Sequence, residues 1–136
     1  MSKVCIITWE TNPIAAELFY AIYDIYEVNV IYVAQRKYSF KEILRRKRGL
    51  RWFWFNIIFS RAQKIFDVGH TPYPDWKELV DTYPDSFLKV SSHNSSDMVS
   101  ILQQSKFELG VLIGTELISP RIYQIPQLGM INLHQG

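Results

Sequence analysis

Short apolar runs alternate with amphipathic stretches along this chain. The apolar runs are rich in β-branched residues, which is typical of strands that are buried on both faces. Between them, apolar residues recur at the three- and four-residue spacing of helices. Strands that alternate with helices favour an α/β fold: an open, mainly parallel sheet with helices on both faces and the first strand at its centre. The five strands are predicted at residues 3–8, 28–34, 87–90, 109–113 and 129–134.

Two of the predicted helices begin at recognisable capping residues. Asn12 suits the cap of the first helix, and Pro13 suits its first position, where no amide hydrogen bond is lost. Asn94 or Ser95 is expected to cap a later helix that runs to about Gln104.

The remaining segments have less regular patterns of apolar and polar residues. Residues 119–124 are expected to form one or two helical turns, and residues 39–66 are mostly helical in character, with an interruption at Gly49. Residues 69–85 contain three prolines and are expected to form a loop.

Composition narrows the class of protein. The chain has 136 residues, of which 48% are hydrophobic, so it has enough apolar material for a core. A single cysteine excludes an internal disulfide and favours a reducing compartment. No apolar run reaches the roughly 18 residues that span a bilayer, and the first apolar run is too short for a signal peptide. We therefore expect a cytoplasmic protein.

Charge is unevenly distributed along the chain. Residues 36–64 hold ten basic residues and one acidic residue, whereas the rest hold five basic and twelve acidic residues. Basic residues beside the aromatic run at 52–55 suit a non-catalytic module that binds an anionic membrane or RNA, with binding that weakens steeply with salt. A helix that packs on the sheet and exposes its charges explains the pattern equally well. The basic residues next to the aromatic run are Arg45, Arg46, Lys47, Arg48 and Arg51.

Several common kinds of site are not predicted. The turn at residues 8–12 has no glycine, so it lacks the close backbone approach that a dinucleotide or ATP phosphate needs. His70, His93 and His134 show no zinc-ligand spacing, and no metal site is expected. Cys5 lies in a buried strand and is expected to act as a small hydrophobic residue.

The last predicted strand carries the most informative polar pair. Asn132 and His134 are two residues apart, so both side chains point to the same face of the strand. Open α/β sheets bind ligands at the carboxyl ends of their strands. An amide donor beside an imidazole suits a carbonyl that is about to become tetrahedral. A polar strand end that meets solvent explains the same pair, because Asn-x-His is a short motif.

Three motifs follow one another within residues 108–136. A strand ends in a glycine turn at residues 113–115, an Ile-Pro pair follows at residues 125–126, and the Asn-x-His strand comes last. In this order and spacing they resemble the N-terminal catalytic domain of the folate-dependent formyltransferases, which include methionyl-tRNA, glycinamide ribonucleotide and sugar-nucleotide N-formyltransferases. The resemblance implies a doubly wound, Rossmann-like sheet.

The resemblance also implies a reaction. A formyl group would pass from the co-substrate 10-formyltetrahydrofolate to an amine, such as an amino sugar nucleotide. Asn132 matches the asparagine that stabilises the oxyanion, and His134 matches the catalytic histidine. The turn that helps to form the folate pocket is matched by Ile113, Gly114, Thr115 and Glu116.

In this family a catalytic aspartate lies some tens of residues beyond the histidine. We therefore expect residues 1–136 to be the N-terminal part of a single formyltransferase catalytic domain, incomplete at its C-terminus and inactive alone. A different Rossmann-like domain that binds a sugar nucleotide would keep the fold without needing Asn132 and His134.

Overall fold

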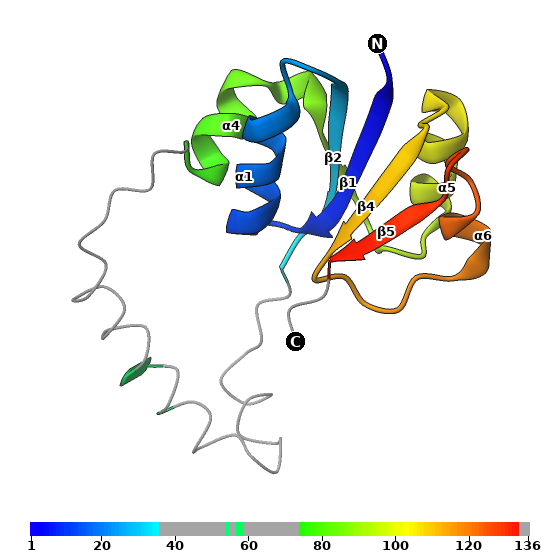
Figure 1. The fold of residues 1–136 in the computed structure, drawn as a ribbon. Helices are drawn as coiled ribbons and strands as arrows, with labels where there is room; N and C mark the ends of the chain where they lie inside the picture. Colours follow the sequence, from blue (N-terminus) through cyan, green and yellow to red (C-terminus); the bar gives the residue numbers. More distant parts are fainter. Residues whose placement is uncertain (36–53, 55–56, 59–73, 134–136) are drawn as a thin grey trace. The chain divides into compact units, whose positions relative to one another are not determined.

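The computed structural model of this chain describes residues 1–35, 54, 57–58 and 74–133. The chain divides into two compact units. One combines Met1–Gln35 with Tyr73–Gly136, and the other is Arg36–Pro72. The strands of the described residues all lie in the first unit (Figure 1).

A five-stranded, all-parallel sheet forms the centre of the first unit. The strand order is β3-β2-β1-β4-β5, which places β1 in the middle (Figure 1). This is the order of the first five strands in Rossmann-like folds. The predicted strands, their parallel pairing and the central position of the first are therefore confirmed. The strands are β1 (Lys3–Trp9), β2 (Glu27–Val33), β3 (Phe87–Val90), β4 (Leu109–Ile113) and β5 (Met130–Leu133).

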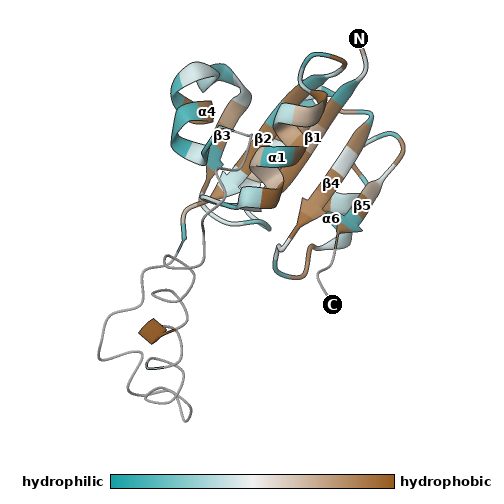
Figure 2. Cartoon of the chain, turned by 60° about the vertical axis from the view of Figure 1, so that its left-hand side comes forward, coloured by the Kyte–Doolittle hydropathy of each residue, from teal (hydrophilic) through white to brown (hydrophobic). Residues whose placement is uncertain are grey.

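Helices cover both faces of the sheet, as expected for an α/β fold. On β1, Val4 and Ile6 face one apolar cluster, while Cys5 and Ile7 face a second cluster on the other side. Figure 2 shows the resulting apolar strands between helices of mixed polarity. The helices are α1 (Pro13–Ile22) and α4 (Trp76–Thr82) with the first cluster, and α5 (Ser96–Ser105) and α6 (Pro120–Tyr123) with the second.

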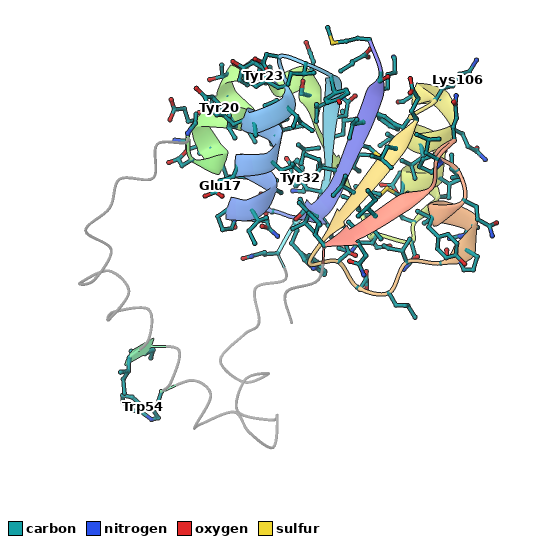
Figure 3. All side chains as sticks on the ribbon, viewed as in Figure 1. Glu17, Tyr20, Tyr23, Tyr32, Trp54 and Lys106 are labelled. Atoms are coloured by element: carbon teal, nitrogen blue, oxygen red, sulfur yellow. The ribbon has the colours of Figure 1, made fainter. Side chains whose placement is uncertain are left out.

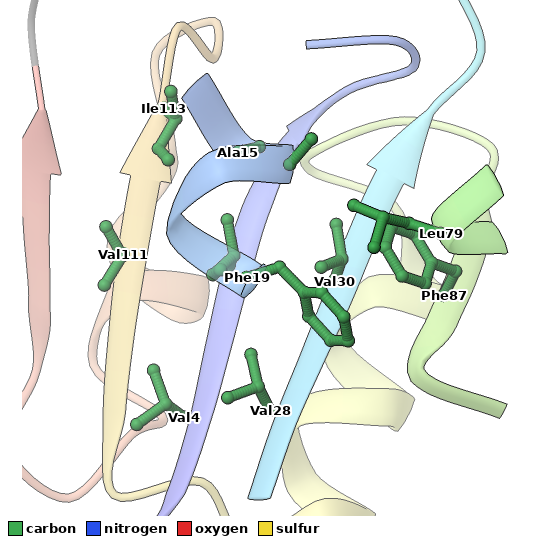
Figure 4. Close-up of a cluster of buried hydrophobic side chains, with 11 residues drawn as sticks. Val4, Ala15, Phe19, Val28, Val30, Leu79, Phe87, Val111 and Ile113 are labelled. Carbon is green, nitrogen blue, oxygen red and sulfur yellow. The ribbon is translucent and has the colours of Figure 1, made fainter. Parts of the chain in front are cut away.

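The first cluster is built around Phe19 of α1, which is buried against the sheet (Figure 4). Its ring centroid lies 5.0 Å from that of Phe87 on β3 and 5.4 Å from that of Tyr83. Tyr23, the residue that caps the C-terminal end of α1 (labelled in Figure 3), stacks on Phe19 with 5.8 Å between ring centroids. These ring contacts fasten α1 to the β3 side of the sheet.

The helix caps agree with the sequence prediction and decide one open alternative. Asn12 Oδ1 accepts hydrogen bonds from the amides of Ile14, at 3.0 Å, and Ala15, at 3.3 Å. Ser95, and not Asn94, caps α5, because Ser95 Oγ accepts from the amide of Met98 at 3.4 Å. Asn94 is thereby left to make other contacts.

The predicted loop at residues 69–85 is wrong in its second half, where α4 lies. Asp75 caps this helix, since its Oδ1 accepts from the amide of Glu78 at 2.8 Å. Pro74 precedes the cap, and Pro84 begins the short 3₁₀ turn that follows, η1 (Pro84–Ser86). The prolines therefore bound the helix and do not interrupt it.

The predicted helical segment at residues 39–66 falls almost entirely outside the described residues. Trp54, Ile57 and Ile58 are helical, and nothing further of that segment is described. In the part of the chain that the structure describes, no helix combines the length and apolar character needed to cross a membrane.

Candidate functional site

A cleft of about 860 Å³ opens at the carboxyl ends of β1, β4 and β5. Its walls come from the turn after β1, the first residues of α1, the turn after β4 and the side of β5. Ligands of open α/β sheets bind at this edge. The described residues therefore place the cleft where the fold class predicts a binding site.

The turn after β4 is fixed by two side chains from the start of the chain. Thr8 Oγ1 donates to the carbonyl of Ile113 at 3.1 Å, and Asn12 Nδ2 approaches the same carbonyl at 3.5 Å. Asn12 thus joins the first turn of α1 to the end of β4 with one side chain. Gly114 follows with a φ of +64°, in the left-handed region that favours glycine.

The cleft brings together most of the residues singled out from the sequence. Ile113, Gly114, Thr115 and Glu116 all line it, and so does Asn132. Asn132 is paired with Leu112 in the register of β4 and β5, and its side chain is exposed. An exposed amide in the cleft is available to a ligand. His134 lies outside the described residues, so its geometry is not part of this site.

The turn after β1 has backbone strain that the sequence did not reveal. Thr11 has a φ of +62°, which a β-branched residue rarely adopts. It lines the cleft next to Asn12. Strained residues of this kind cluster at binding sites, where the surrounding structure holds them. The missing glycine at residues 8–12 has not prevented this turn from taking a conformation that glycine usually adopts.

His93 is a buried polar residue of this region that the sequence analysis did not select. Its side chain has no exposed surface, and its Nε2 lies 2.9 Å from the carbonyl oxygen of Thr8. Its ring lies nearly perpendicular to that of Trp9, at an interplanar angle of 80°, with 4.6 Å between centroids. Its Nδ1 lies 3.4 Å from Oε1 of Glu116. Sequence spacing gave no signal for this group, because its partners lie far from residue 93 along the chain.

Asn94 ties the loop after β3 to the loop after β4. Its Nδ2 donates to the carbonyl of Leu117 at 2.9 Å, and its Oδ1 accepts from the amide of Ser119 at 2.7 Å. Arg121 of α6 donates to the Asn94 carbonyl. The Asn94 side chain therefore holds the backbone that follows Glu116. Ser95 caps α5 in its place.

Other predicted residues are not part of the cleft. Cys5 is fully buried in β1, and burial raises the pKa of its thiol to about 12. Among the described residues, no group of three metal-ligating side chains is found. The basic residues Arg45, Arg46, Lys47, Arg48 and Arg51 lie outside the described residues.

Gly114 and Gly129 offer a matched pair of substitutions, because Gly129 also has a positive φ, of +83°, but does not line the cleft. A Cβ at Gly114 would meet Asn12 Nδ2 at 3.6 Å, an ordinary contact, and a Cβ at Gly129 would meet nothing within 4 Å. We expect each glycine-to-alanine variant to lose about 1–2 kcal/mol of unfolding free energy through backbone strain. Urea unfolding measures this loss, and an unchanged midpoint for both variants would contradict the strain.

Comparison with known proteins adds no family. A scan of protein-family models and a search of curated proteins both find no match to this chain. The function of this chain is therefore inferred from the residues of the cleft and from the resemblance of residues 108–136.

Proposed function

We propose that this chain contributes the folate side of a formyltransferase site, for transfer of a formyl group from 10-formyltetrahydrofolate to an amine. One observation carries the proposal. The glycine turn and Asn132, which the resemblance assigns to folate binding and oxyanion stabilisation, line a single cleft at the carboxyl edge of the sheet. Thr8 and Asn12 contact the Ile113 carbonyl and hold that turn in place at the cleft wall.

The resemblance implies the following reaction for these residues. The lone pair of the amine attacks the formyl carbon and forms a carbon–nitrogen bond, while the formyl oxygen becomes negatively charged. The Asn132 amide donates a hydrogen bond to this oxyanion. The attacking nitrogen loses a proton, the tetrahedral centre collapses, and the bond to the folate nitrogen breaks. The folate nitrogen takes a proton as tetrahydrofolate leaves. The resemblance assigns the proton transfer to His134.

The acceptor amine is proposed only as a class. The resemblance suggests an amino sugar nucleotide as the acceptor. The Gly114 turn is assigned to folate binding and gives no information about the acceptor. A panel of amino sugar nucleotides and simpler amines, incubated with 10-formyltetrahydrofolate and the full-length protein, would identify the acceptor by its gain of a formyl group in the mass spectrum.

Folate binding can be tested separately from the transfer reaction. Alanine at Gly114 adds a methyl group to the cleft wall, whereas alanine at Gly129 adds the same strain elsewhere. We expect Gly114→Ala to weaken tetrahydrofolate binding about tenfold or more, as misplaced methyl groups do in fitted pockets. Gly129→Ala should bind as the parent does. Equal affinities for all three proteins in calorimetric titrations would count against folate in this cleft.

A further inference from the structure

The pairing of His93 with Glu116 requires a proton between them. A backbone carbonyl only accepts hydrogen bonds, so Nε2 of His93 must carry the hydrogen that points to Thr8 O, 2.9 Å away. In the neutral ring, Nδ1 then carries a lone pair. That nitrogen lies 3.4 Å from Oε1 of Glu116, and an ionised carboxylate also offers only lone pairs. Without a proton, the two groups repel.

Burial raises the cost of leaving this contact unsatisfied. His93 has no exposed surface, and its Nδ1 makes no hydrogen bond to any of the described residues. The carboxylate of Glu116 lies within ion-pair distance of this nitrogen, at 3.4 Å. The other contacts of the ring are the hydrogen bond from Nε2 to the Thr8 carbonyl and the near-perpendicular packing against Trp9.

The other side of the pair faces the cleft. The Glu116 side chain is 50% exposed and lines the cleft wall. With Oε1 turned toward His93, the second carboxylate oxygen is left for a ligand. The backbone beyond Glu116 is already held, because Asn94 bonds to both Leu117 and Ser119. The contacts of Asn94 therefore fix the backbone next to Glu116, and the contact with His93 fixes the position of the Glu116 carboxylate.

We propose that His93 is a positioning residue for the cleft: an ion pair between its ring, protonated at Nδ1, and Glu116 Oε1, 3.4 Å away, holds the Glu116 carboxylate in the wall, as an acceptor for N–H groups of a ligand. The pairing itself stands on geometry alone. The identity of the ligand as a folate rests on the function proposed above.

The proton is visible in the imidazole nitrogen resonances of His93 at pH 6, assigned by their loss in His93→Asn. We expect two protonated nitrogens in the parent protein. In Glu116→Gln the side-chain amide can donate to the lone pair of Nδ1, so the buried ring needs no second proton and should be neutral, with hydrogen on Nε2 alone. A neutral His93 ring in the parent, or the same doubly protonated ring in Glu116→Gln, would overturn the proposal.

Binding of tetrahydrofolate separates positioning from a merely structural role. Glu116→Ala removes the acceptor and should weaken binding about 10- to 100-fold, the usual range for one charged hydrogen bond. His93→Leu should weaken it to the same extent. His93→Asn keeps a neutral N–H close to the place of Nδ1 and should restore affinity to within about threefold of the parent, well inside that range.

The outcomes distinguish this proposal from the proposed function. If the parent protein binds no tetrahydrofolate, the folate function fails, and the nitrogen resonances still decide the pairing of His93 with Glu116. If the parent binds but Glu116→Ala binds equally well, Glu116 is no acceptor and this proposal is wrong while the folate function stands. If His93→Leu does not fold, Glu116→Gln and His93→Asn still give the comparison.

Discussion

Alanine at Asn132 or at His134 is expected to slow formyl transfer by the full-length protein about 10²–10³-fold, the usual loss for one oxyanion donor. Tetrahydrofolate affinity should change little, because the oxyanion exists only along the reaction path and not in the bound ground state. Asn132 is exposed in the cleft, so its removal leaves no cavity in the core. His134→Ala should cost at least as much, since it also removes the proposed proton carrier.

Single-turnover assays with 10-formyltetrahydrofolate and the accepted amine measure this effect apart from product release. Gln103→Ala is a suitable control, because Gln103 is an exposed residue of α5 that does not line the cleft. If both variants transferred the formyl group within about threefold of the parent rate, the loss would be far smaller than the removal of one oxyanion donor causes. Asn132 and His134 would then be ordinary polar residues. The enzyme proposal would then rest on fold resemblance, which does not establish function.

Alkylation of Cys5 in the native protein is expected to be at least about 10³-fold slower at pH 8 than in the urea-unfolded chain. Only the thiolate reacts, and burial in β1 raises the pKa of this thiol from 9.0 to about 12. The chain has one cysteine, so the reaction reports on this position alone. Mass spectrometry of samples quenched over time measures both rates.

A cysteine placed on the surface provides the control for this experiment. Ser100 of α5 is exposed, so Ser100→Cys combined with Cys5→Ala should be alkylated in the native protein about as fast as in urea. Native Cys5 reacting at the rate of that surface cysteine would show that β1 is not buried between two helical layers as described.

The strands were predictable because their apolar runs carry the signal of burial on both faces, and only their ends differ from expectation. The apolar run predicts a first strand that ends at Thr8, whereas β1 includes Trp9. Helix α4 was missed because Pro74 and Pro84 are typical of loops. The spacing of Asp75 and Glu78 held the contrary signal, since an acidic cap with glutamate three residues later marks a helix start.

The site was predictable only in part. Gly114 and Asn132 were selected from motifs that lie close together in sequence, and the sheet brings both to the cleft. His93 could not be selected, because its role depends on a carbonyl 85 residues away and on the direction of one ring nitrogen. Thr11 was also missed, because no local pattern predicts a β-branched residue with a positive φ.

The central position of β1 has a consequence for synthesis on the ribosome. β1 pairs with β2 on one edge and with β4 on the other, and Thr8 and Ile113 of the second pair are 105 residues apart. At about 5–20 residues per second, translation reaches β4 on the order of 5–20 s after β1. Throughout that interval the nascent chain exposes one unpaired edge of its central strand, the kind of edge that recruits other strands. Co-translational chaperones that shield such edges should therefore raise the yield of this protein more than they raise the yield of chains whose first strand ends at a sheet border.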